Sequence, residues 1–152
     1  MKINFDVKFV SGLVGSLNIQ VIPMDLDRNE NCIDSIVVDE IAFSLVENLF
    51  NRDKEKFFHW GNTFIDSENI KEIIKDLYKL HSFINQLDKY DKTLKLIFEK
   101  ETKWFANHFN FFKPQALNMI IEITKFLERV EKKYDGITVI VILDSIVDNK
   151  SL

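Results

Sequence analysis

Alternating oxygen-bearing side chains are the first feature of the chain that could do chemistry. In "DLDRNEN", residues 25–31, Asp and Asn recur at every second position, which is the ligand spacing at the start of a calcium-binding loop. That loop needs glycine at its sixth position for a sharp turn and glutamate at its twelfth to close the cage. Glu30 and Ile36 stand at those positions. The stretch is therefore interpreted as a solvated acidic loop without a bound metal.

The histidines and the single cysteine form no pattern of metal ligands or nucleophiles. His59, His81 and His108 are far apart in the sequence, and Cys32 alone cannot complete a zinc tetrad or an internal disulfide. No G-x-S-x-G elbow or phosphate-binding glycine loop occurs. We therefore predict no catalytic residues, no metal and no cofactor.

The segment "FFHWGNTF", residues 57–64, combines a loop, a glycine, a histidine and a tryptophan. One interpretation is a ligand or enzyme pocket built around His59, Trp60 and Cys32, with Phe64 beside it. The other is an aromatic plug that closes the open end of the helices. Large aromatic side chains are normally buried, so the plug is favoured.

The most aromatic stretch is "KWFANHFNFFK", residues 103–113. On a helix, Phe105, His108, Phe109 and Phe112 share one face, and this stripe continues upstream as aliphatic residues. Such continuity indicates core packing, whereas a platform for stacking nucleic acid bases needs a cationic groove beside the rings. Phe111 lies off the stripe and is expected near the surface, or against another element at the bend before Pro114.

Acidic side chains are concentrated between residues 25 and 40 of a chain whose net charge is -4. Two of the acids are expected to complement the positive end of a following helix. Asp25, Asp27, Glu30 and Asp34 have no such local role. We expect these four to border an interface with a basic protein partner, because opposite charge speeds association.

Hydrophobic periodicity predicts a single α+β domain over residues 1–152. Residues 3–9 and 17–21 alternate as two strands of a hairpin, and the apolar run 137–143 indicates a third strand, which is expected to be the most buried. Helices are expected over residues 35–50, 67–87, 92–112 and from Pro114 to about residue 133. The order ββααααβ gives a three-stranded antiparallel sheet packed with about four helices.

The composition of the chain limits its expected cellular location and the classes of partner. The chain has 152 residues, of which 46% are hydrophobic, and it shows no leader-like segment at its start and no apolar run long enough to span a membrane. The lone cysteine favours a reducing, cytoplasmic location. Without a basic run, neither nucleic acid nor a membrane is expected as a direct partner.

The profile of the whole chain resembles the immunity proteins of bacterial toxin–immunity systems, including the contact-dependent inhibition type. The shared features are one small acidic domain, the absence of a catalytic constellation and the clustered acids. The resemblance implies a non-enzymatic cytoplasmic protein that binds and neutralises a cognate toxin, often a basic nuclease. The alternatives are a small-ligand-binding protein or enzyme with a pocket near His59, Trp60 and Cys32, and a structural subunit of a larger assembly.

Neutralising Asp25, Asp27, Glu30 and Asp34 to Asn or Gln tests the acidic interface. With a purified basic partner, association is expected to slow at low salt while the circular dichroism spectrum stays the same, because surface attraction acts mainly on the association rate and is screened by salt. Unchanged association kinetics at low ionic strength would leave these acids as a solubilising surface.

Overall fold

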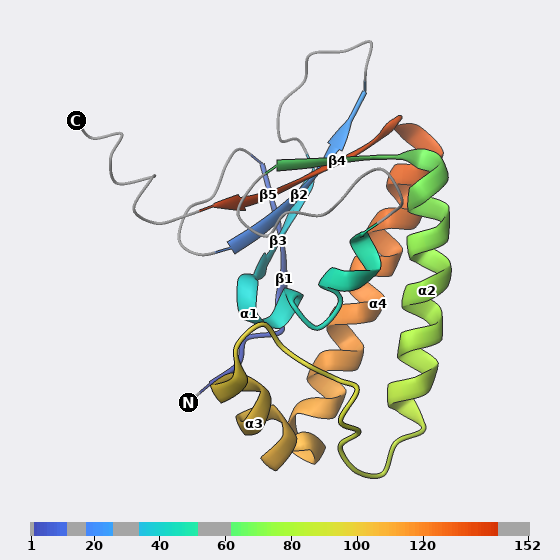
Figure 1. The fold of residues 1–152 in the computed structure, drawn as a ribbon. Helices are drawn as coiled ribbons and strands as arrows, with labels where there is room; N and C mark the ends of the chain where they lie inside the picture. The colour runs from blue at the N-terminus through green and yellow to red at the C-terminus, as the bar shows by residue number, and fades with distance from the viewer. Residues whose placement is uncertain (1, 12–17, 26–33, 52–61, 143–152) are drawn as a thin grey trace, which may run out of the picture.

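Five strands form one antiparallel sheet, seen as the arrows in the upper half of Figure 1. The computed structural model describes residues 2–11, 18–25, 34–51 and 62–142. The strands are β1 (Val7–Val10), β2 (Asn18–Met24), β3 (Ser35–Asp39), β4 (Asn62–Asp66) and β5 (Gly136–Ile142). They lie in the order β1-β3-β2-β5-β4. The predicted α+β class is confirmed, but the prediction of three strands was too low.

The two ends of the described chain meet in the middle of this sheet. Strand β5 pairs with β2 from Asn18↔Ile142 to Met24↔Gly136, and β4 pairs with its other side. Ile137 and Val139 of β5 are fully buried. The predicted union of the C-terminal strand with the N-terminal part of the chain is therefore confirmed. The prediction that this strand is the most buried one was wrong for its described residues, because Thr138 and Ile140 are half-buried while five residues of β2 are buried.

The predicted N-terminal hairpin was wrong, because a strand that the sequence did not reveal lies between its two members. Strand β1 pairs with β3, and β3 pairs with β2. The residues of β3, "SIVVD", had been assigned to a helix over 35–50 because apolar residues recur there every four positions. Consecutive β-branched side chains favour an extended backbone, and that preference determined the structure.

Short helical turns replace the rest of that predicted helix. Asp39 caps α1 (Glu40–Phe43) by accepting hydrogen bonds from the N–H groups of Ile41 at 3.0 Å and Ala42 at 3.3 Å. A 3₁₀ helix, η1 (Glu47–Phe50), follows. Strand β4 was also missed, since the whole stretch from 51 to 66 had been predicted as irregular.

The longer helices follow the prediction with two shifted boundaries. Helix α2 (Ser67–Asn85) begins where expected, and Asp66 caps it by accepting from the N–H of Asn69 at 2.9 Å. The helix expected from residue 92 begins only at Glu99, and the boundary expected at Pro114 lies at His108, between α3 (Glu99–Asn107) and α4 (Phe109–Lys133). Pro114 lies in the second turn of α4, where its missing N–H removes one helical hydrogen bond.

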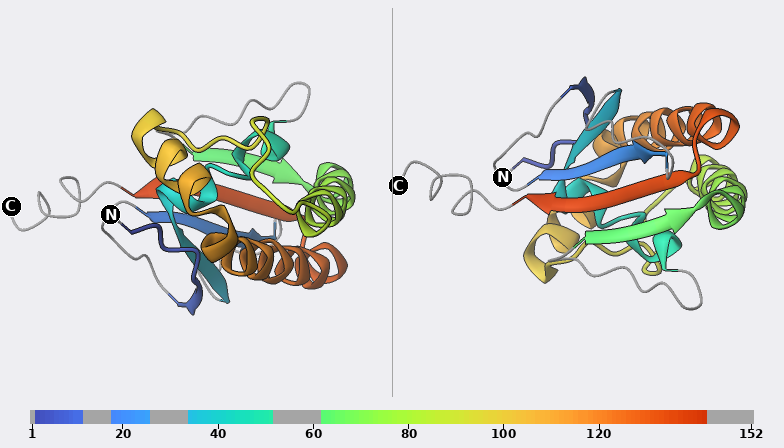
Figure 2. Two further views of the ribbon diagram at one scale, coloured as in Figure 1. Left: turned by 90° about the horizontal axis from the view of Figure 1, so that it is seen from below. Right: turned by 90° about the horizontal axis from the view of Figure 1, so that it is seen from above.

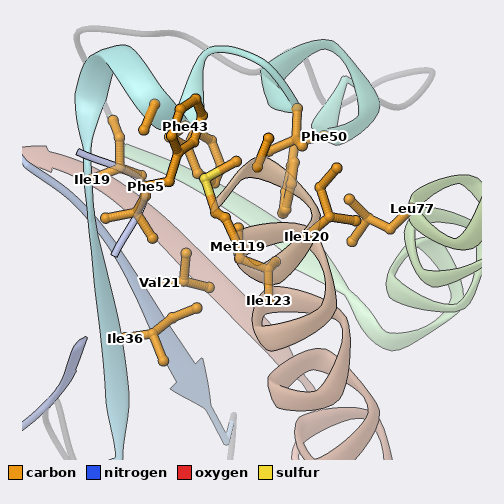
Figure 3. Packing of buried hydrophobic residues seen from close by; sticks show 14 of the residues in the cluster. Phe5, Ile19, Val21, Ile36, Phe43, Phe50, Leu77, Met119, Ile120 and Ile123 are labelled. Carbon is orange, nitrogen blue, oxygen red and sulfur yellow. The ribbon is translucent and has the colours of Figure 1, made fainter. Parts of the chain in front are cut away.

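The helices cover one face of the sheet, and Figure 2 shows that no described helix lies in front of the other face. Helices α2 and α4 run side by side, and the hydroxyl of Tyr78 donates to the carboxylate of Glu128 between them at 2.9 Å. The core lies between these helices and the sheet. Figure 3 shows its sheet side, with Ile19, Val21 and Ile36, and its helical side, with Met119, Ile120 and Ile123.

The aromatic stretch 103–113 contributes to this core, as predicted, but not with every residue. Phe105, Phe109 and Phe112 are buried, and the ring of Phe105 lies 5.7 Å from that of Phe109 and 6.0 Å from that of Phe112. Phe111 is 67% exposed, which confirms its predicted position near the surface. His108 is exposed, so its assignment to the buried stripe was wrong.

Phe105→Ala is expected to lower the free energy of unfolding by about 3–5 kcal/mol, because it leaves a cavity among buried rings. The matched change on the surface, Phe111→Ala, is expected to alter that free energy by less than about 0.5 kcal/mol. Urea unfolding followed by circular dichroism measures both. Equal midpoints for the two variants would show that Phe105 is not part of the core.

Candidate functional site

The junction between α3 and α4 lies within the aromatic stretch, whose side chains divide between the core and the surface. His108 has φ -123° and ψ 34°, outside the helical range, and α4 restarts at the next residue. Phe105, Phe109 and Phe112, which are four and three residues apart, are buried in the core. Trp104, His108 and Phe111 are left at the surface or half-buried, although they come from the same eleven residues.

These residues line a hollow that we call the aromatic groove. Its lining consists of Lys2, Ile3, Trp104, His108, Phe111, Phe112 and Gln115, and its volume is about 480 Å³. The walls are mainly apolar, while Lys2, His108 and Gln115 supply polar groups. A volume of this size lies within the usual range of binding pockets, roughly 300–1,000 Å³. The N-terminal segment and the α3–α4 junction, far apart in the sequence, thus build one surface.

Trp104 and His108 contact each other in the aromatic groove through their rings and through a hydrogen bond. Their ring centroids are 4.0 Å apart, and Nδ1 of His108 lies 3.1 Å from the carbonyl oxygen of Trp104. A carbonyl can only accept, so Nδ1 carries the proton in this hydrogen bond. In the neutral ring, Nε2 is then a hydrogen-bond acceptor. The groove therefore presents one oriented polar atom beside its apolar walls.

The indole nitrogen of Trp104 is buried, and it has no hydrogen-bond partner in the described part of the chain. A buried N–H without an acceptor destabilises a protein by about 1–3 kcal/mol. Few native side chains carry such a donor without a structural or functional reason. Its position in the wall of the aromatic groove makes this residue a candidate for contact with a ligand or partner.

A second surface, at the other end of α4, is charged. Lys125, Arg129, Lys132 and Lys133 are exposed, and we call them the basic row. They line two adjoining hollows of about 260 Å³ and 350 Å³, which share Arg129 and Lys133. Glu128 lies beside the row, and its hydrogen bond from Tyr78 raises the pKa of that phenol.

The acidic residues predicted to bind a partner are placed only in part. Asp25 is half-buried just after β2, while Asp27 and Glu30 lie outside the described residues. Asp34 is exposed, has a left-handed backbone with φ 57°, and lines a hollow together with Arg129 and Lys133. The cations beside Asp34 reduce its negative potential, so it does not belong to an uninterrupted acidic surface.

The structure does not bring Asp34 close to the aromatic groove. Phe111 lies in the first turn of α4, and Arg129 lies in its last turns. At 1.5 Å per residue, the helix separates their backbones by about 27 Å. Asp34 and the aromatic groove therefore lie near opposite ends of α4.

The predicted pocket residues His59, Trp60 and Cys32 lie outside the described residues. Phe64 is described and half-buried on β4. Its ring lies over Gly136, where an added Cβ would come within 2.9 Å of it and within 2.3 Å of the carbonyl oxygen of Ile65. Phe64 thus packs within the sheet, while a pocket around the other three residues stays a prediction.

No group of three or more His, Cys, Asp or Glu side chains in residues 2–11, 18–25, 34–51 and 62–142 could hold a metal ion. Within the same ranges, every helix is too short or too polar to cross a membrane.

Sequence reasoning missed the aromatic groove as a unit. The off-stripe position of Phe111 was visible in the sequence, but the break at His108 was not. Lys2 and Ile3 join the groove only because the fold returns the N-terminal segment to the α3–α4 junction. No periodicity connects residues so far apart.

Comparison with known proteins adds no assignment, because neither a protein-family model nor a curated protein nor a solved structure matches the chain.

Proposed function

We propose that this protein is a non-enzymatic, protein-binding domain that recognises its partner through the aromatic groove. The observation that carries the proposal is an apolar hollow of about 480 Å³ bordered by a phenylalanine that is 67% exposed. Exposed apolar surface gathered around a hollow is typical of interaction sites, and aromatic residues commonly dominate the binding energy there.

Exposure of Phe111 has no structural benefit for the isolated chain. Full burial of such a side chain stabilises a protein or a complex by about 1.5–3 kcal/mol. Its ring packs edge-to-face on Phe112 at 5.2 Å, a contact that favours one orientation of the ring. A rigid aromatic side chain loses little conformational entropy on binding, which favours affinity.

The occupant that fits this groove is an apolar side chain projecting from a partner protein. Ile3, Trp104 and Phe112 supply an apolar floor and walls. Lys2 and Gln115 can donate hydrogen bonds to carbonyl groups around that side chain, and His108 Nε2 can accept one. Such polar groups at the rim fix orientation, while the apolar contact supplies most of the affinity.

The narrower proposal is an immunity protein that acts in the bacterial cytoplasm and neutralises a cognate toxin. It rests on the resemblance of the whole-chain profile. In this proposal a basic toxin domain is attracted by Asp25, Asp27, Glu30 and Asp34. Asp39 and Glu40 are excluded from that role, since Asp39 caps α1 and Glu40 is buried.

A second candidate function is the binding of a small apolar molecule in the same groove. Two observations favour it: the volume of the hollow and the buried indole N–H of Trp104 without an acceptor. Native mass spectrometry of protein purified from its own cell separates the two functions. A stoichiometric small molecule that is lost in Trp104→Ala would favour the second.

Phe111→Ala is expected to weaken binding of the partner by at least about 30-fold, the loss of about 2 kcal/mol that marks a dominant interface residue. The partner is first found by capture from the native cell and then purified for isothermal titration calorimetry. Phe111 is exposed, so the variant is expected to keep its fold.

Phe83→Ala is the matched control, because Phe83 is an exposed phenylalanine on α2 that does not line the aromatic groove. It should change the affinity by less than about threefold. If Phe111→Ala and Phe83→Ala bind the partner equally well, the aromatic groove is not the recognition surface.

A further inference from the structure

The basic row on α4 is a group of neighbouring cations without carboxylate partners in the described part of the chain, as are Lys79 and Lys100, whereas three other helical lysines have such partners. Lys71 lies 3.4 Å from Glu68, Lys75 lies 3.6 Å from Glu72, and Lys103 lies 3.4 Å from Glu99. Within the part of the chain that the structure describes, no ion pair involves Lys125, Arg129, Lys132 or Lys133. Four neighbouring cations repel one another, so this arrangement brings no evident stability.

The helix dipole explains only half of the basic row. Lys132 and Lys133 lie in the last turn of α4, where a cation complements the negative end of the helix. That effect falls off within one turn. Lys125 and Arg129 lie further back along the helix and need another explanation.

Arg129 is held over the margin of the sheet. Its guanidinium carbon lies 5.5 Å from the ring centroid of Phe9 and 5.9 Å from that of Phe126. Phe9 belongs to β1 and is 54% exposed, although its ring also contacts Phe126 at 6.5 Å. Stacking on aromatic faces orients the guanidinium and leaves its N–H groups available for a carboxylate.

Strand β1 is an edge of the sheet. It pairs with β3 on one side, and among the described strands none pairs with its other side. An added strand would lie about 4.8 Å beyond β1, and its side chains would alternate between the two faces. On the helix side those side chains would approach Arg129, and on the opposite side they would approach Lys8, which alternates with Phe9.

We infer that the outer edge of β1 and the basic row together bind an acidic, extended segment of a partner protein by strand addition. Backbone N–H and C=O groups of β1 form the hydrogen bonds to the added strand. The basic row on one face of the sheet and Lys8 on the other form ion pairs with its acidic side chains. This surface is separate from the aromatic groove, and the inference does not depend on the function proposed for that groove.

The distribution of charge favours an acidic peptide over a second copy of this chain and over nucleic acid. A second copy of the chain would place its own Lys8 near Lys8 across a β1–β1 contact, which opposes self-pairing. Nucleic acid carries negative charge along its whole length, and the chain carries a net charge of -4 with Asp34 and Glu128 beside the cations. A short acidic peptide, in contrast, places its negative charges beside Lys8 and the basic row and not along the remaining acidic surface.

Fluorescence anisotropy with the full chain at low salt tests the inference. The probe is a fluorescein-labelled, end-capped eight-residue peptide of alternating Glu and Thr. We expect it to bind, and we expect Arg129→Glu to weaken binding by at least about tenfold, because a like charge replaces the pairing partner. Lys75→Glu, a matched change on α2, should stay within about twofold of the unsubstituted chain.

Two further probes separate strand addition from simple charge attraction. A peptide of equal charge with Pro in place of Thr cannot form a continuous ladder and should bind at least about fivefold more weakly. An eight-nucleotide oligothymidylate should bind more weakly than the Glu–Thr peptide. If circular dichroism shows that Arg129→Glu does not fold, the double variant Lys125→Glu, Lys132→Glu replaces it, since both lysines are exposed.

Three results would overturn the inference. Equal affinity for the Pro and Thr peptides would exclude strand addition. Tighter binding of the oligothymidylate, lost in Arg129→Glu, would make the basic row a nucleic-acid site. No binding of the Glu–Thr peptide at millimolar concentration would show that β1 and the basic row do not accept an acidic strand.

Discussion

The pairing of β2 with β5 is the contact on which the remaining structure depends. It joins residues 18–24 to residues 136–142, and the helices that the structure describes lie between these two segments in the sequence. The turn before β5 is tied at both sides, because Asp135 N–H donates to the Met24 carbonyl and the Asp135 carbonyl accepts from Ser67 N–H, each at 2.9 Å. The same turn therefore fixes the end of α4 and the start of α2.

Helix α4 carries that constraint to both candidate surfaces. Its middle packs on the sheet through Met119, Ile120 and Ile123, which are fully buried. Its first turns wall the aromatic groove, and its last turns present the basic row. Because one rigid helix bears both surfaces, their separation of about 27 Å is set by helix geometry. The core thus positions both candidate surfaces, and its residues Ile3 and Phe112 also line the aromatic groove.

Sequence patterns predicted correctly those helices and strands that depend mainly on interactions between neighbouring residues. The cap at Asp66, the stripe of α2 and the apolar run of β5 each predict their own structure from adjacent residues. Residues 35–39 were assigned wrongly because apolar spacing of four competes there with β-branched side chains, and only the neighbouring strands β1 and β2 settle that competition. The break at His108 depends on similarly distant contacts, among them the ring of Phe5 against those of Phe105 and Phe112.

The candidate sites were less predictable than the fold, for the same reason. The aromatic groove joins Ile3 to Phe111. Phe9 of β1 and Asp34, which precedes β3, lie beside the basic row although they are remote from it in the sequence. The sequence pattern showed that Phe111 lies off the apolar stripe and that acidic residues are concentrated between residues 25 and 40. It could not show that Asp34 lies beside Arg129, because that proximity exists only once β3 has paired on both sides.

Native-state hydrogen exchange tests most directly whether β2, β5 and α4 form one cooperative unit. The account predicts that the slowest amides of β2, of β5 and of residues 119–130 exchange with the same free energy, equal to that of global unfolding. The amides of α3, which is short and contributes only Phe105 to the buried residues, should exchange through smaller openings. Exchange of residues 119–130 well below the global free energy, while β2 and β5 stay protected, would show that α4 is not held by the sheet and would contradict the account.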